Sequence, residues 1–183
     1  MSKENADKEQ KRSFKREVFS WIACIVVTIL LTEFILNFVI INANIPSGSM
    51  ENTIMTNDKL IALRTSYWFN DPKRGDIIIF KYPDDETEWF IKRVIALPGE
   101  TVLVKDGKVY INGSKKALSE PYIKEEPVED FGPYKVPKNG YFVMGDNRNN
   151  SNDARDWETH YVSRDEVLGK AWFRYYPSIK VIK

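Results

Sequence analysis

The chain has 183 residues, a formal net charge of +1 and a single cysteine. This length is enough for one hydrophobic core with an additional tail or anchor. The charge balance provides no global field that would attract nucleic acid. A single cysteine excludes an intrachain disulfide and a cysteine-based metal site.

The first 41 residues are predicted to form a basic tail and a membrane span. Residues 1–17 are charged, lack apolar periodicity and are expected to be mobile. Residues 18–41 form an apolar run of 24 residues, roughly 36 Å long as a helix, which is enough to cross a bilayer and too long for a cleavable targeting peptide. Six basic residues precede this run: Lys3, Lys8, Lys11, Arg12, Lys15 and Arg16. They predict a cytoplasmic N-terminus, with residues 42–183 outside the membrane.

Two side chains within the predicted span allow alternative interpretations. Glu33 either marks a functional site or is a protonated or snorkelling group in the outer half of the membrane. Cys24 is either acylated or a buried, inert thiol.

Beyond residue 42, short runs rich in Ile and Val predict β-strands, and no long amphipathic helix is expected. The expected strands are 59–63, 76–81, 89–96, 101–105, 108–111, 141–144, 168–173 and 180–182. Asp106-Gly107 is a strong hairpin-turn signal, and the polar, proline-bearing residues 114–138 are expected to be an insertion. The predicted fold class is therefore mainly β, with residues 42–183 as one barrel-like antiparallel domain behind one N-terminal transmembrane helix.

Ser47-Gly48-Ser49, after Pro46, is the first segment with the composition of a catalytic site. Proline fixes the turn and glycine permits a close approach, so one hydroxyl and one backbone N–H could reach the same carbonyl oxygen. A flexible linker leaving the membrane is the alternative. A serine needs a base to become a nucleophile, and the only histidine, His160, has no partner histidine and is expected to be structural or exposed.

A lysine is the remaining candidate for the base, provided that burial lowers its pKa. Lys92 lies in a mainly apolar strand, on the same face as Phe90 and Val94 by strand alternation. A lysine at the surface edge of a sheet is the alternative. The polar stretch 145–156 follows the strand 141–144. Its ligand spacing does not fit a calcium-binding loop, which leaves two alternatives: part of the catalytic site or a solvated loop.

These segments together resemble the type I signal peptidases, the serine–lysine enzymes of protein export, in their compact Gram-positive form. The resemblance runs in order from Ile45 to Arg155 and includes Arg74-Gly75-Asp76 and the block 92–100. It thins across residues 101–140.

The resemblance implies a role for each matching residue. Ser49 would be the nucleophile and Lys92 the general base. The Ser49 backbone N–H and the Ser47 hydroxyl would bind the oxyanion. Ser151 would donate or accept a hydrogen bond with Lys92 and orient it.

Supporting and substrate-binding residues follow from the same resemblance. Two ion pairs would hold the 145–156 loop against the lysine strand: Asp153 with Arg155, and Asp146 with Arg93. The shallow pockets for the −1 and −3 residues of the substrate would be lined by Ile45, Ile54, Phe90 and Ile91. No cofactor or metal is implied.

The predicted function is that of a membrane-anchored serine endopeptidase, which removes signal peptides from exported preproteins by cutting after small residues at −1 and −3. Its partners would be secretory preproteins, the lipid bilayer and, as a further candidate, the export translocon, but no nucleic acid. The aromatic run 67–69 would either enter the membrane interface or pack in the barrel.

Two other functions compete with this one. A self-cleaving serine–lysine regulator is disfavoured by the transmembrane anchor. A non-catalytic, membrane-tethered binding domain is disfavoured by the presence of both Ser49 and Lys92.

Overall fold

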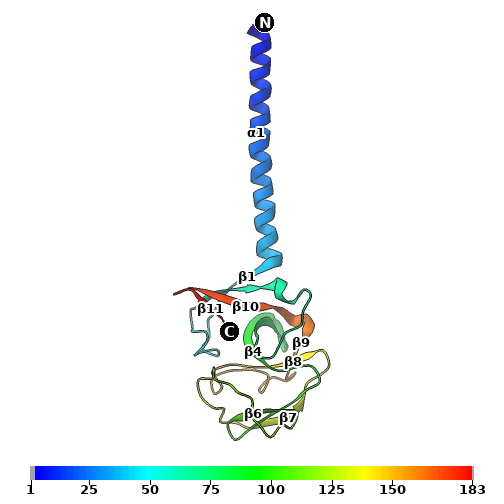
Figure 1. Ribbon diagram of the computed structural model, residues 1–183, viewed down its shortest axis with the longest axis vertical. Coiled ribbons are helices and arrows are strands. Elements are labelled where there is room, and N and C mark those ends of the chain that lie inside the picture. The colour runs from blue at the N-terminus through cyan, green and yellow to red at the C-terminus, as the bar shows by residue number, and fades with distance from the viewer. Residues whose placement is uncertain (1–2, 183) are drawn as a thin grey trace. The chain divides into compact units, whose positions relative to one another are not determined.

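The computed structural model describes residues 3–182, and the chain divides into two compact units at Val39 (Figure 1). The first unit is helical. It consists of α1 (Lys3–Phe34) and a π-helix, η1 (Ile35–Val39). Within it, Phe14–Val39 is a stretch of 26 residues that is long and apolar enough to cross a membrane.

The helix has different bounds from those expected from the sequence. It already includes most of the basic segment, because Lys, Glu, Gln and Arg are good helix formers. It also ends before residue 41, because Ile40 and Ile41 pair with Leu63 and Ala62 as the first residues of a strand. Inside the helix, the Asn37 amide donates to the Glu33 carboxylate at 3.0 Å, one turn away.

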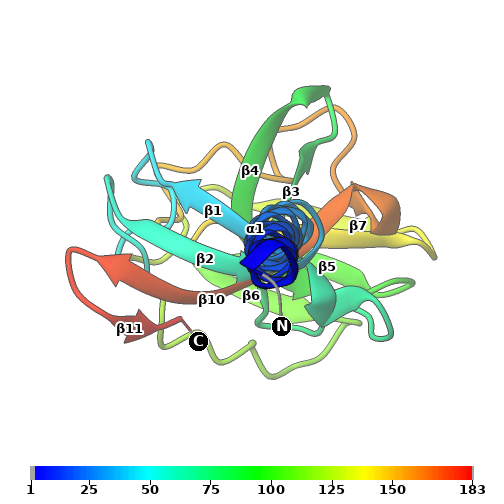
Figure 2. The same cartoon turned by 90° about the horizontal axis from the view of Figure 1, so that it is seen from above.

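The second unit is mainly β (Figure 2). Its strand pairs are all antiparallel among the described residues. The main sheet has the order β1 (Ile40–Asn44), β2 (Lys59–Leu63), β10 (Val167–Tyr176), β3 (Ile77–Tyr82), β4 (Asp85–Ala96), β8 (Gly140–Met144) and β9 (Val162–Ser163), with β11 (Lys180–Val181) beside β10. A smaller sheet has the order β6 (Lys108–Ile111), β5 (Thr101–Lys105) and β7 (Phe131–Lys135). Two short 3-10 helices, η2 (Arg64–Tyr67) and η3 (Arg164–Glu166), complete the unit.

The mainly β, antiparallel class predicted from the sequence is confirmed, but the main sheet is open among the described residues. Its strand pairs run along a path that ends at β1 and β9, and these two strands do not pair with each other. β1 pairs only with β2, and β9 has two residues that pair only with β8. The outer edge of β1 is therefore left unpaired.

Alternation along β3 separates two hydrophobic cores. Ile78 and Phe80 pack into the larger core, whereas Ile77 and Ile79 pack into the smaller one. A strand that is apolar on both faces belongs in the middle of a sheet, and β3 lies there between β10 and β4. β4 continues from an exposed first half into a fully buried second half, which carries Lys92 into the interior.

Candidate active site

The nucleophile segment leaves β1 and is anchored by its own buried side chains. Met50 and Ile54 are buried in the smaller core, and the amide of Ile54 donates to the carbonyl of Met50 at 2.8 Å. This turn holds Ser49 at the wall of the domain, where only 7% of its surface is exposed. The sequence Pro46-Ser47-Gly48-Ser49 is thus an ordered turn and not a flexible linker.

Lys92 lies directly against Ser49. Its Nζ donates a hydrogen bond to the Ser49 Oγ at 2.8 Å, although the two residues are 43 positions apart. Lys92 is opposite Ile78 of β3, its Nζ lies 5.3 Å from the centroid of the Phe90 ring, and only 4% of the residue is exposed. Lys92 is thus in the interior and not at a solvated sheet edge.

This environment changes the acidity of the lysine. Burial lowers the pKa of the Lys92 ammonium from its usual 10.5 to about 8, while the negative charge of Asp153 acts in the opposite direction. At pH 7 a lysine with this pKa is neutral in about one molecule in eleven, compared with about one in 3,000 for a solvated lysine. Lys92 can therefore accept a proton near neutral pH.

Ser47 lies beside the nucleophile. The two hydroxyl oxygens, Ser47 Oγ and Ser49 Oγ, are 3.4 Å apart. Among the hydrogen bonds of residues 3–182, none uses the backbone N–H of Ser49. The Ser47 hydroxyl and the Ser49 backbone N–H, to which the family resemblance assigns oxyanion binding, therefore both lie beside the Ser49 Oγ.

Ser151 is placed differently from the sequence expectation. Its Oγ is buried but forms no hydrogen bond with any described residue, so the expected bond to Lys92 is not formed in this structure. Ser151 instead lies against Gly145. A Cβ atom at Gly145 would lie 2.2 Å from the Ser151 Oγ and 2.4 Å from the Ser49 carbonyl oxygen. Only glycine fits where these two segments meet.

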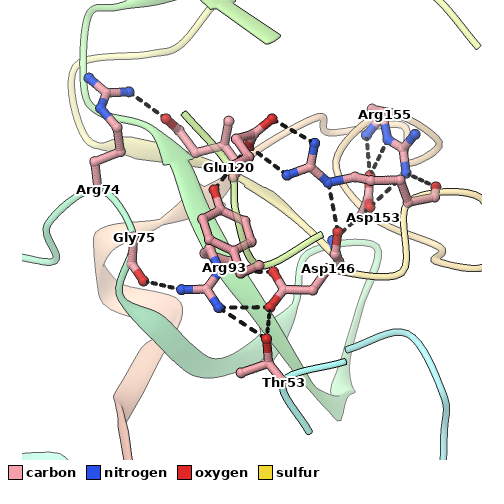
Figure 3. A network of polar contacts seen from close by, with 12 residues as sticks. Thr53, Arg74, Gly75, Arg93, Glu120, Asp146, Asp153 and Arg155 are labelled. Atoms are coloured by element: carbon pink, nitrogen blue, oxygen red, sulfur yellow. Dashed lines mark hydrogen bonds and ion pairs between the residues drawn. The ribbon is translucent and has the colours of Figure 1, made fainter. Parts of the chain in front are cut away.

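Both expected ion pairs are present, and Figure 3 shows them in one network. Arg93 Nε and Nη2 donate to the two carboxylate oxygens of Asp146 at 2.8 and 2.7 Å, and Arg93 Nη1 donates to the Gly75 carbonyl. Arg155 donates to Asp153 at 2.8 and 3.0 Å, and Asp153 also accepts from the Gly145 N–H at 2.9 Å.

The pairs fasten the loop that follows β8 to the lysine strand. Arg93 is the next residue after Lys92 on β4, and Asp146 is the next residue after Gly145. The Thr53 hydroxyl, at the end of the nucleophile turn, also donates to Asp146. One buried network therefore ties the nucleophile turn, the lysine strand and this loop together.

Further residues of the site were not predicted from the sequence. Asn147 donates from its backbone N–H to the Ser49 carbonyl at 3.0 Å and from its side chain to the Gly48 carbonyl at 2.9 Å. Glu120 forms a buried pair with Arg148, with donor–acceptor distances of 2.6 and 3.0 Å. Asn147 and Arg148 lie in the polar loop that the sequence singled out, but nothing in the sequence pairs that loop with Glu120.

A groove of about 620 Å³ opens at the dyad. It runs between residues 41–49 and residues 88–92, with Asn150 and Asn152 at its border. Of the predicted pocket residues, Ile45, Phe90 and Ile91 line it. Ile54 does not, because it is buried in the smaller core and anchors the nucleophile turn.

Other candidate residues lie away from the groove. The His160 ring packs edge-on against Phe131 and Tyr134, and its Nδ1 is 2.8 Å from the Ala154 carbonyl, which is a structural arrangement. Tyr67 is buried, whereas Phe69 is 91% exposed. Among the described residues, no group of three or more His, Cys, Asp or Glu could hold a metal ion.

Comparisons with known proteins identify relatives across most of the chain. Residues 18–176 match the family described as signal peptidase, peptidase S26. A probable signal peptidase I-2 of Synechocystis is 44% identical, over 85% of this chain and 72% of that protein. A signal peptidase I of Bacillus amyloliquefaciens is 34% identical, over 96% of this chain and 97% of that protein. A solved signal peptidase I from Enterococcus faecalis is 36% identical, over 55% of this chain and 97% of that chain, with a TM-score of 0.48.

Proposed function

The chain belongs to the signal peptidase family, peptidase S26, and on that basis we propose that it removes signal peptides from exported preproteins with a Ser49–Lys92 dyad. The observation that carries this proposal is the 2.8 Å hydrogen bond between the buried Lys92 Nζ and the Ser49 Oγ. Nucleophile and base are within proton-transfer distance, and burial keeps an appreciable fraction of the base neutral.

The first half-reaction forms an acyl-enzyme. Neutral Lys92 takes the proton of the Ser49 hydroxyl as Oγ bonds to the carbonyl carbon of the −1 residue. The carbonyl oxygen becomes an oxyanion, for which the Ser49 N–H and the Ser47 hydroxyl are the donors. When the C–N bond breaks, the Lys92 ammonium returns its proton to the leaving amine. The mature protein leaves, and the signal peptide stays on Ser49 as an ester.

The second half-reaction restores the enzyme. Neutral Lys92 takes a proton from a water molecule, whose oxygen attacks the ester carbonyl carbon. The same two donors stabilise the second oxyanion. When the bond to Ser49 Oγ breaks, Lys92 returns the proton to that oxygen. The signal peptide leaves with a free carboxylate, and no cofactor takes part in either step.

The groove is suited to an extended substrate. β4 pairs with β3 along residues 89–93, but with β8 only from Arg93 onward. Among the described residues its other edge is therefore unpaired before Arg93, and so is the outer edge of β1. A peptide in the groove could pair its backbone with these edges, and the apolar walls at Ile45, Phe90 and Ile91 would receive the small −1 and −3 side chains.

The apolar helix supplies the membrane anchor of this proposal. Six basic residues at its start favour a cytoplasmic N-terminus, which would place the β-unit on the outer side of the cell membrane. Ser49 follows the end of the apolar stretch at Val39 by about ten residues, so the dyad would work near the bilayer surface, where a preprotein leaves the translocon.

Cleavage of a preprotein by the full chain in detergent micelles tests the proposal, with the new N-terminus mapped by sequencing. We expect one cut after a small residue, its loss in Ser49→Ala and in Lys92→Ala, and its retention in the exposed control Ser119→Ala. A preprotein that is bound but never cut would favour the tethered binding domain. Cleavage of the chain itself, with intact preprotein, would favour the self-cleaving regulator.

A further inference from the structure

Glu88 is the only acidic residue among those that line the groove. Its carboxylate forms no hydrogen bond or ion pair with any of residues 40–182. The other acidic residues of the same hairpin are engaged: Asp84 accepts from Thr159, Asp85 accepts from Thr87, and Glu86 accepts from Lys81 at 3.2 Å. Glu88 is therefore a free negative charge at the wall of the groove.

The backbone around Glu88 is a bulge in β4. Lys81 pairs with Trp89 and Tyr82 pairs with Asp85, so residues 86–88 have no partners on β3. The bulge is fixed locally, because the Thr87 N–H and hydroxyl both donate to the Asp85 carboxylate, at 3.0 and 2.6 Å. Bulges commonly re-aim a side chain beside an active site, and this one leaves Glu88 lining the groove.

The position of Glu88 along β4 identifies the part of the substrate that it would meet. Glu88 precedes Lys92 by four residues, which corresponds to about 13 Å of extended strand. An extended peptide beside β4 covers this distance in about four residues as well. Ile91 and Phe90, the walls for the small −1 and −3 side chains, lie between the two ends. Glu88 then faces the signal peptide near position −5.

We propose that Glu88 selects the charge of the signal peptide four to six residues before the cut, favouring Lys or Arg there and disfavouring Asp or Glu. This inference rests on the proposed function. The carboxylate attracts a cationic side chain and repels an anionic one, and Lys92, the only other ionisable residue lining the groove, lies at the opposite end. Because Glu88 is exposed, we expect a Lys-to-Glu preference of roughly fivefold at low ionic strength, which salt reduces.

Matched peptides test the inference. At each of the positions −4, −5 and −6, three versions of one signal-peptide substrate carry Lys, Gln or Glu. The full chain cleaves these peptides in uncharged detergent micelles. The readout is the ratio of kcat/KM for the Lys and Glu versions. We expect a ratio of roughly five at one of these positions for the parent, near one for Glu88→Gln and below one for Glu88→Lys.

Glu86→Gln is the control of equal net charge, because Glu86 is on the same bulge but pairs with Lys81 and does not line the groove. It should keep the parental ratio. A ratio that is unchanged in Glu88→Gln, or lost equally in Glu86→Gln, would overturn the role of Glu88. If the parent cuts the Gln peptides after −1 but its Lys-to-Glu ratio of kcat/KM is one at all three positions, the inference about Glu88 fails and the proposed function stands. If the parent does not cut the Gln peptide, both fail.

Discussion

Lys92 combines two properties that normally exclude each other, because it is almost fully buried and yet ionisable. Among the described residues its one hydrogen-bond partner is the Ser49 hydroxyl, and its other neighbours include Ile78 across the strand pair and the Phe90 ring. An ammonium in such surroundings is destabilised relative to the neutral amine. The same burial that makes Lys92 a base should therefore reduce the stability of the fold.

Lys92→Met tests this cost. The pKa of the lysine is 10.5 when it is solvated and about 8 in the folded chain. Between these two pH values the unfolded state therefore binds more protons than the folded state. The parent protein becomes more stable as pH rises through this range. A shift of this size corresponds to about 3 kcal/mol below pH 8 and about 1 kcal/mol at pH 9.5. The gain in free energy of unfolding from Lys92→Met should therefore shrink by about 2 kcal/mol between pH 7 and pH 9.5.

Denaturant unfolding of the full chain in detergent micelles, followed by tryptophan fluorescence, measures this difference at the two pH values. Lys108→Met is the matched control, because Lys108 is exposed on β6 and its ammonium is solvated before and after unfolding. A Lys92→Met effect that does not change with pH would mean that burial does not destabilise the charged lysine.

Gly145 is the second residue on which the site depends. Its missing side chain lets the Ser49 carbonyl and the Ser151 side chain approach, and an added Cβ would overlap both. Gly145→Ala should therefore displace Ser49 and lower kcat by at least roughly tenfold, as expected when a nucleophile moves by a fraction of an ångström. A steady-state assay gives kcat, and a melting curve separates displacement from unfolding. A folded Gly145→Ala variant with parental kcat would show that this close approach is not needed.

At the scale of elements, residues 112–130, which connect β6 to β7, contact several parts of the site and are called the strap. Glu120 pairs with Arg148, the Tyr122 ring lies 3.9 Å from the Arg93 guanidinium carbon, and Lys124 pairs with Glu51 on the nucleophile turn. Arg148 also donates to the Gly145 carbonyl at 2.9 Å. The strap thus supports the loop and the turn from a part of the sequence that shows no catalytic motif.

The two ion pairs of the strap should differ in strength. The side chains of Arg148 and Glu120 are 0% and 6% exposed, whereas those of Lys124 and Glu51 are 47% and 26% exposed. Glu120→Gln leaves a buried guanidinium without its counter-charge and should lower the free energy of unfolding by about 3 kcal/mol. Lys124→Gln should change it far less, because the exposed Lys124–Glu51 pair is screened by solvent. Equal losses in denaturant unfolding would contradict this ranking.

The elements also show what the sequence could and could not predict. Three strands, 59–63, 101–105 and 108–111, match β2, β5 and β6, and the Asp106-Gly107 turn has the two positive φ angles, 49° and 73°, that its composition predicts. β1 was missed because its isoleucines extend the apolar run of the helix. β7 was missed because Gly132 and Pro133 interrupt its pattern.

The candidate site was predictable where family motifs carry it. Ser49 and Lys92 lie together as expected, and so do Arg93 with Asp146 and Arg155 with Asp153. The contacts of Thr53, Asn147 and Glu120 were not predictable. Each joins segments that are distant in sequence, for example 93 positions between Thr53 and Asp146, and no local pattern records such a contact.

At the scale of the whole molecule, the proposed function depends on which side of the membrane the β-unit occupies. The basic N-terminal segment and the apolar stretch Phe14–Val39 predict an N-terminus inside and a β-unit outside. Protease added to intact protoplasts should digest the β-unit and spare a tag at residue 1. A protected β-unit would place the dyad in the cytoplasm and favour the self-cleaving regulator.

The measurement that tests the central claim most directly is the pH dependence of kcat/KM for preprotein cleavage by the full chain. Because Lys92 must be neutral to act as the base, kcat/KM should rise with pH and reach a plateau above an apparent pKa of about 8. Lys92→Arg should be inactive across the range, because arginine stays charged. An active Lys92→Arg variant, or a profile without an ascending limb between pH 6 and pH 10, would contradict a dyad in which Lys92 activates Ser49.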